Sequence, residues 1–241
     1  MSRPFACVDY IEFDGKRYMY LEDDNPIAAY QTPEISFVAQ PLGDAEFNKA
    51  HNVVVVPLIM NGFWDIFLEH PNLISELRQI EKIYDYAFIG QYHYMNRDVF
   101  LHLEERGLIS NYYCEKNPVN TFGMTKEEKK PEIIKYWKEI AAAKFVFAPR
   151  GMGSSSYRLY EAMMVGSVPI ITGMLDYPFD NEVGWDFMSI RGGPLFSLIQ
   201  KSKKLSSQQW DWCSKQAMGF WDEYCRHDKL YEKLDAYLSR T

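Results

Sequence analysis

The sequence predicts an α/β protein built from parallel sheets, on three observations. Short apolar runs alternate with segments of helical spacing through most of the 241 residues, and such alternation is typical of parallel strands joined by right-handed crossovers. Apolar residues make up 47% of the chain, enough for an ordered core. The alternation falls into two series that separate near residue 80. We therefore expect two Rossmann-like halves that face a cleft.

Composition excludes several other classes. The formal net charge of −7 argues against general nucleic-acid binding. The four cysteines are scattered without a CxxC pair, so we expect free thiols and neither a zinc site nor a disulfide scaffold. No apolar stretch approaches the roughly 20 residues that span a bilayer, and the N-terminus lacks a signal-peptide core. A cytoplasmic or otherwise soluble protein is expected, or one separated from a membrane anchor.

The first series contains mostly short strands. Phe5–Phe13 and Arg17–Leu21 flank the turn dipeptide Asp14-Gly15, which predicts a β-hairpin. A short strand, a buried strand and a helix are then expected at Ile35–Ala39, Val53–Met60 and Asn72–Ile83.

The second series begins with a strand at Tyr86–Ile89. A helix over about Arg97–Glu105, a strand at Ser110–Cys114 and a helix over Lys126–Ala143 follow, the last with Thr125 as N-cap and Pro131 as a break. The tail from Ser206 to Tyr237 is expected to be helical with a break near Gly219. Its Trp and Tyr residues indicate a packing surface or, alternatively, a sugar-stacking surface.

The most informative stretch is the one from Lys144 to Phe187. An apolar run, Phe145–Ala148, precedes a Gly/Ser loop, Gly151–Ser156, and a helical segment, Tyr157–Val165. Gly166 and a second apolar run, Val168–Ile171, come next. This order of strand, loop, helix and strand places backbone N–H groups at a helix N-terminus, where they favour an anion.

Side chains around this loop suit a diphosphate. Glycines such as Gly153 allow close approach, Ser154 and Ser155 add hydroxyl donors, and Arg150 and Arg158 offer forked contacts. The alternative is a serine helix cap beside a structural arginine. The loop lacks the Gly-Lys-Ser/Thr of a Walker loop and the third glycine of a dinucleotide fingerprint.

Glu161 lies three residues after Arg158, on the same helix face. A carboxylate at this place can accept both hydroxyls of a ribose, as acidic groups do in other nucleotide sites. The alternative is an intrahelical ion pair between Arg158 and Glu161.

The order of these residues resembles the exostosin (GT47-type) family of glycosyltransferases. The segment Tyr86–Gly90 with Arg97 is also similar to a strand and loop of that family, so the resemblance covers roughly residues 84–190. The residues that match in the main stretch are Pro149, Arg150, Gly151, Gly153, Ser155, Arg158, Glu161, Ala162, Gly166, Val168, Pro169, Ile170, Pro178, Phe179, Trp185 and Phe187. Two positions depart: Gly184 stands where the family has Asp, a role that Asp186 could take over, and Ser167 stands where it has Cys.

The resemblance implies a GT-B fold and an inverting transfer from a nucleotide-sugar, expected to be a UDP-sugar, to a glycan. The expected units are an acceptor-side domain over residues 1–80, a donor domain over residues 81–220, and a helix over residues 221–241 that crosses back. The diphosphate and ribose would be held without a metal ion or other cofactor. The implied donor-binding residues are Gly90, His93, Arg97, Arg150, Gly153, Ser154, Ser155, Arg158 and Glu161.

An inverting transfer also needs a base for the acceptor hydroxyl. Asp65 follows the strongest strand of the first half and is the candidate, with Asp9, Glu34 and His93 as alternatives; a solvated or helix-capping role for Asp65 stays open. The pair Asp23-Asp24 could hold a metal ion, but the following Asn-Pro favours a turn. A non-catalytic nucleotide-sugar- or glycan-binding module remains the second functional hypothesis.

Overall fold

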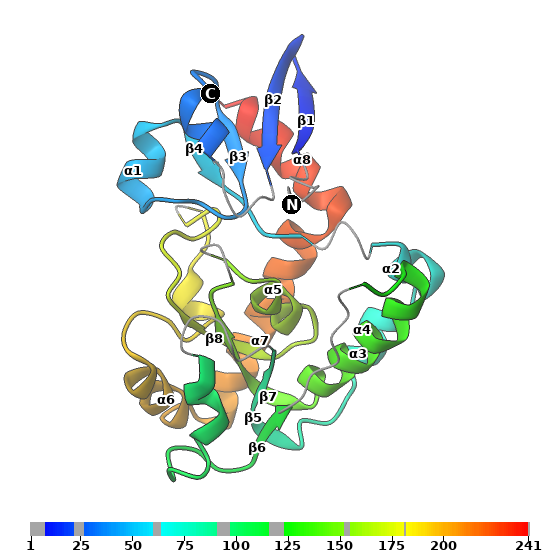
Figure 1. Ribbon diagram of the computed structural model, residues 1–241, viewed down its shortest axis with the longest axis vertical. Coiled ribbons are helices and arrows are strands. Elements are labelled where there is room, and N and C mark those ends of the chain that lie inside the picture. The colour runs from blue at the N-terminus through cyan, green and yellow to red at the C-terminus, as the bar shows by residue number, and fades with distance from the viewer. Residues whose placement is uncertain are drawn as a thin grey trace.

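The protein, seen here as a computed structural model, is a mixed α/β structure with two sheets rich in parallel strands (Figure 1). The structure describes residues 8–21, 27–59, 64–90, 97–115, 123–151, 155–180 and 182–240. This agrees with the predicted Rossmann-like α/β class. The finer GT-B arrangement and the domain boundaries stay predictions.

The first sheet has the strand order β1-β2-β3-β4 within the described residues. β1 (Val8–Phe13) and β2 (Lys16–Leu21) form the predicted hairpin, with Phe13 opposite Lys16. Asp14 and Gly15 have φ of 49° and 71°, and two positive values are those of a type I′ turn. The hairpin prediction is confirmed. The other elements of this region are η1 (Ile27–Gln31), β3 (Ser36–Val38), α1 (Ala45–Ala50) and β4 (Val53–Val55), with β2, β3 and β4 parallel.

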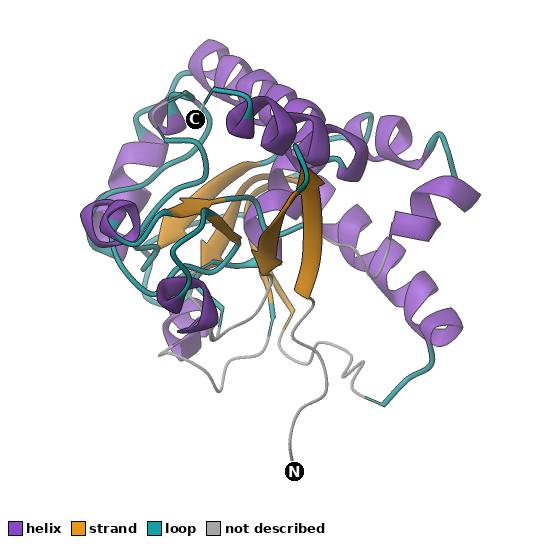
Figure 2. Ribbon diagram, turned by 90° about the horizontal axis from the view of Figure 1, so that it is seen from above, coloured by secondary structure: helices purple, strands orange, loops and turns teal. Residues whose placement is uncertain are grey.

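The second sheet has the order β6-β5-β7-β8, and its strands are parallel. The chain leaves β5 for β6 on one side and returns to β7 on the other, so the strand order reverses between β5 and β7. Helices lie on both sides of the strands (Figure 2). The elements are β5 (Tyr84–Ile89), η3 (Arg97–His102), β6 (Tyr112–Glu115), α4 (Lys126–Ala141), β7 (Ala143–Pro149), α5 (Tyr157–Met164), β8 (Val168–Thr172), η4 (Trp185–Phe187) and α6 (Leu195–Lys203).

Helix α4 begins where the sequence predicts and continues where a break was predicted. Thr125 and Glu128 form a capping box, in which the Glu128 N–H donates to Thr125 Oγ1 and the Thr125 N–H donates to Glu128 Oε2. The predicted break at Pro131 is wrong, because the helix runs through it to Ala141. Pro131 lies in the second turn, so it removes only the bond to the carbonyl of Glu127, near the exposed end of the helix.

The C-terminal tail is interrupted slightly later than predicted. α7 (Ser207–Phe220) passes through Gly219 and ends in a π-helical turn, η5 (Trp221–Cys225), before α8 (His227–Leu238). α8 lies beside the first sheet (Figure 1), where the Tyr231 ring is 6.4 Å from that of Tyr20. The last helix therefore packs on the sheet that is earliest in sequence.

One hydrophobic core joins the two sheets. A single cluster of buried side chains includes Phe37 of β3 and Val146 of β7. α2 (Trp64–Glu69) and α3 (Leu73–Arg78) lie with the second sheet: the Phe67 ring stacks 5.1 Å from that of Trp137 on α4, and Arg78 pairs with Asp222 at 2.8 Å. In the described part of the chain, no helix is both long enough and apolar enough to cross a membrane.

Candidate functional site

The candidate site lies at the carboxyl edge of the second sheet, between β5 and β7. In open parallel sheets, ligands bind beyond the strand ends at the point where the strand order reverses. Gly90 directly follows β5 and Arg150 directly follows β7, so both predicted residues stand at this point. Arg97 opens η3 and Arg158 lies in the first turn of α5. The fold therefore brings these four predicted residues to one edge.

The loop between β7 and α5 is tied to the strand ends. The Arg150 N–H donates to the carbonyl of Thr172 at the end of β8 (3.1 Å), and the Gly151 N–H donates to the carbonyl of Ser155 (2.7 Å). Ser155 is buried, and Ser156 is the N-cap of α5 without a side-chain capping bond. The predicted donor-site residues Gly153, Ser154 and His93 lie outside the described residues.

Arg158 has incomplete hydrogen bonding. Its Cζ lies 4.8 Å from the ring centroid of Phe88, over the aromatic face. Its Nη2 occupies the space that a Cβ on Gly90 would need, so glycine leaves room for the guanidinium. Its Nε and Nη1 are buried and have no hydrogen-bond partner within the described structure. Buried guanidinium donors normally have partners, so this arrangement suits an anionic ligand.

Arg97 adds a second cation to the same edge. Its side chain is only 7% exposed, and its Nη2 donates to the carbonyl of Arg150. Burial and the nearby charge of Arg158 lower the pKa of Arg97 to about 10. Two neighbouring guanidinium groups repel each other in the absence of an anion and would bind one together.

Glu161 is buried against α4. The Tyr136 hydroxyl donates to Glu161 Oε2 (2.8 Å), and the Trp137 indole N–H donates to Glu161 Oε1 (3.2 Å). Burial raises the pKa of Glu161, while these two donors and the charge of Arg158 oppose the rise. Sequence reasoning missed Tyr136 and Trp137, because an aromatic residue on an amphipathic helix is usually only part of the core.

The end of α5 explains the glycine that the sequence places there. Gly166 has φ of 74°, and the N–H groups of Gly166 and Ser167 donate to the carbonyls of Met163 (3.2 Å) and Ala162 (2.9 Å). These two bonds form a Schellman motif, which ends the helix and turns the chain into β8. The position of α5, which carries Arg158, is thereby fixed at the C-terminal end of the helix.

Asp65, the candidate base, lies in a different charged cluster. Its Oδ2 is 3.2 Å from Lys126 Nζ and 3.2 Å from Lys130 Nζ, both at the start of α4. Burial would raise the pKa of Asp65, but hydrogen bonds and charges from the two lysines lower it. A carboxylate held in its ionised form is a weaker base, so these contacts give the predicted catalytic role no support.

The other carboxylates considered from the sequence are those of Glu34, Asp9, Asp23 and Asp24. Glu34 is exposed between η1 and β3, and Asp9 lies in β1 opposite Tyr20. Asp23 and Asp24 lie outside the described residues. Among the residues that are described, no group of three His, Cys, Asp or Glu side chains gathers as a metal site.

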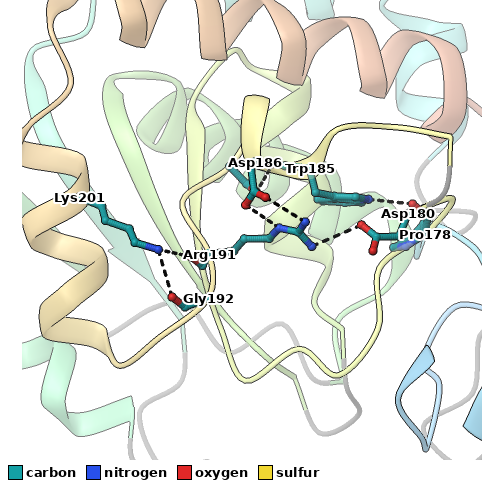
Figure 3. A network of polar contacts seen from close by, with 8 residues as sticks. Pro178, Asp180, Trp185, Asp186, Arg191, Gly192 and Lys201 are labelled. Atoms are coloured by element: carbon teal, nitrogen blue, oxygen red, sulfur yellow. Dashed lines mark hydrogen bonds and ion pairs between the residues drawn. The ribbon is translucent and has the colours of Figure 1, made fainter. Parts of the chain in front are cut away.

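Asp186 could take the role of the aspartate that the exostosin family has at the position of Gly184. It is part of an ion-pair network (Figure 3). Arg191 Nε donates to Asp186 Oδ1 (2.9 Å) and Arg191 Nη1 to Asp180 Oδ1 (3.4 Å). The neighbouring Trp185 is buried and its indole N–H donates to the carbonyl of Pro178 (2.8 Å). These contacts hold together the loop that follows β8.

A cavity lies at the opposite, amino edge of the second sheet. Its volume is about 660 Å³. The residues that line it include Asp85, Tyr86, Lys144, Ser202 and Trp210.

Comparison with known proteins adds one match. A family model, the RXYLT1 C-terminal domain, matches residues 70–181. The matched range runs from just before α3 to the loop after β8, so it contains the described residues of the candidate site. No curated protein matches the chain. The similarity supports a relation to glycosyltransferases, and it does not single out the exostosin family.

Proposed function

We propose that the protein is an inverting glycosyltransferase that moves a sugar from a nucleotide-sugar, specifically a UDP-sugar, to a hydroxyl of a glycan. The similarity to the RXYLT1 C-terminal domain supports the transferase class. The single observation that carries the donor assignment is the buried guanidinium of Arg158, whose Nε and Nη1 have no partner in the described structure.

The chemistry of the transfer explains why such a group is needed. The acceptor oxygen bonds to the anomeric carbon as the bond from that carbon to the diphosphate oxygen breaks, and the electron pair leaves with the diphosphate. The acceptor proton passes to a base. The negative charge that develops on the leaving group is stabilised by preorganised cationic donors. Arg158 supplies two buried N–H groups for it, and Arg97 adds a second positive charge, so the proposal needs no metal ion.

Other predicted residues take supporting parts in this proposal. Gly90 makes room for the guanidinium. Arg150, Gly153, Ser154, Ser155 and His93 are proposed as further ligands of the diphosphate. Glu161 is the predicted ribose ligand. The two sheets would form the two halves of a GT-B enzyme, with α8 returning to the first half. The base is left unassigned, because lysines already neutralise Asp65.

The experiment is a calorimetric titration with UDP in the presence of EDTA. Wild type is expected to bind saturably, and Arg158→Ala to bind about 10- to 100-fold more weakly, because a charge-assisted hydrogen bond is worth about 1.5–3 kcal/mol. Arg106→Ala is a matched control, since Arg106 is an exposed arginine outside the site. Equal affinities for wild type and Arg158→Ala would remove the basis of the donor assignment.

A non-catalytic nucleotide-sugar-binding module is the second candidate, favoured by the pairing of Asp65 with two lysines. This reading expects saturable UDP binding without hydrolysis or transfer across a panel of UDP-sugars. Donor hydrolysis that disappears in Arg158→Ala would exclude it.

A further inference from the structure

Tyr136 connects α4 to the candidate donor site. It belongs to the crossover helix between β6 and β7, and its hydroxyl reaches α5. That hydroxyl donates to Glu161 Oε2 at 2.8 Å. Neither the predicted donor loop nor the proposed function includes this residue.

Both hydrogen bonds that the described structure gives the Glu161 carboxylate come from α4. One oxygen accepts the Tyr136 hydroxyl and the other accepts the Trp137 indole N–H (3.2 Å). Because the two donors are adjacent on one helix, they fix the plane of the carboxylate. A carboxylate that is buried and held in this way keeps its charge in one place.

The charge of the Arg158 guanidinium acts on this carboxylate, although the described structure shows no direct ion pair between the two. The two residues are three apart on α5 and so share a face of the helix. The charge of Arg158 lowers the pKa of both Glu161 and Tyr136, while burial raises each of them. At the end of β5, the guanidinium packs over the aromatic face of Phe88, and Gly90 leaves room for it because glycine has no Cβ.

We propose that Tyr136 is a positioning residue of the donor site, which holds the Glu161 carboxylate as the counter-charge that orients Arg158 toward the diphosphate. The inference rests on the proposed donor function and deepens it. It also gives Glu161 a role different from the predicted one: the carboxylate acts on Arg158 and not on the ribose hydroxyls.

The test compares UDP with 2′-deoxy-UDP as ligands of the full chain, by calorimetry. Tyr136→Phe is expected to weaken both nucleotides to the same degree, by about five- to tenfold. In an Arg158→Ala background the same change is expected to have no further effect, because the group that it positions is absent. A merely structural role would weaken binding in both backgrounds.

Two further variants make the result specific. Tyr113→Phe is the matched control, since Tyr113 on β6 interacts with Glu139 of the same helix α4, away from α5; its UDP affinity should equal that of wild type. Glu161→Gln should weaken the two nucleotides equally, and it tests the inference if Tyr136→Phe does not fold. A loss with UDP that is much smaller with 2′-deoxy-UDP would show that Glu161 binds the ribose, and would overturn the inference.

The outcomes separate this inference from the proposed function. If Tyr136→Phe keeps wild-type UDP affinity while Arg158→Ala loses it, the positioning role is wrong and the donor site stands. If wild type does not bind UDP, both are wrong.

Discussion

Each of the two edges of the second sheet holds a buried cationic side chain, and the two side chains differ in their hydrogen-bond partners. At the amino edge, Lys82 Nζ donates to the carbonyls of Ala141 (2.7 Å) and Val165 (3.2 Å) and contacts Ser167 Oγ (3.0 Å). At the carboxyl edge, Nε and Nη1 of Arg158 have no hydrogen-bond partner within the described structure. Among the described residues, Lys82 therefore has hydrogen-bond partners for its charged group, whereas two nitrogens of Arg158 have none.

The difference teaches where a ligand is needed. A buried charge whose hydrogen-bond partners come from the fold has a structural role. A buried charge whose N–H donors have no protein partner is suited to bind a ligand that supplies the acceptors. The amino edge has a cavity of about 660 Å³ beside the ion pair of Asp85 and Lys144 (2.7 Å). Unmet hydrogen bonding points to the other edge, where the strand order also reverses.

Of the variants considered, Gly90→Ala should have the largest effect on the candidate site at the carboxyl edge. The new Cβ would overlap Arg158 Nη2, so the guanidinium must move from its place over Phe88. Because only the end of a flexible side chain moves, the free energy of unfolding should change by no more than about 1 kcal/mol. The UDP affinity, measured by calorimetry, should fall by about tenfold or more.

Gly219→Ala is the control for this change. A Cβ at Gly219, within α7, meets no atom within 4 Å. This variant should keep its UDP affinity and gain slightly in stability, as alanine is the better helix former. If Gly90→Ala binds UDP as wild type does, Arg158 is not the group that the ligand needs.

The amino edge should respond to pH through Lys82. Burial lowers the pKa of Lys82 from its ordinary 10.5 to about 7. Between these two values the unfolded chain holds a proton that the folded chain lacks, so the free energy of unfolding rises with pH, by at most about 1.4 kcal/mol per unit. Below about pH 7 both states are protonated and this contribution is constant.

Lys82→Met should remove that slope. The measurement is urea unfolding of wild type and variant at pH 6 to 9, at fixed ionic strength, with pH 6 as the internal control. Parallel curves for the two proteins would mean that the carbonyl dipoles around Lys82 keep it charged in the folded state. The expected UDP affinity at pH 7 is the same for both proteins, because Lys82 lies at the edge away from the proposed site.

The sequence predicted the fold better than the site. The Asp-Gly hairpin, the Thr125 cap and the glycine after α5 could be predicted because each depends on local backbone geometry. The sequence predicts a break at Pro131 because proline usually interrupts a helix. The effect of a proline depends on its position, and in the second turn of α4 it does not end the helix. The resemblance to the exostosin family predicts Arg97 and Arg158 in one site, and in the structure the charge of Arg158 acts on Arg97.

Contacts between helices distant in sequence could not be predicted in this way. Tyr136 reads as a core aromatic, and only the docking of α4 on α5 shows that its hydroxyl holds Glu161. Asp65 looked like a free carboxylate after a strand, and only the position of α4 places Lys126 and Lys130 around it. A pairing of this kind depends on tertiary packing, which the spacing of one segment does not encode.

Asp65→Asn gives the smallest expected effect and sharpens the comparison, since Asp65 combines the two cases. Its Oδ2 receives two lysine partners from the chain, while its Oδ1 is buried without a hydrogen-bond partner among the described residues. The lysines lower its pKa, so its stabilising effect is present at neutral pH and is lost as pH falls through the lowered folded-state pKa. The variant should lose up to about 1 kcal/mol of stability at pH 7, as expected for a partly exposed ion pair, and this loss should shrink as pH falls below the ordinary aspartate pKa of 3.8. Its UDP affinity and its turnover of the donor should stay within about twofold of wild type. A large loss of turnover with unchanged UDP affinity would instead identify Asp65 as the base, and would show that partners supplied by the chain do not by themselves separate structural charges from catalytic ones.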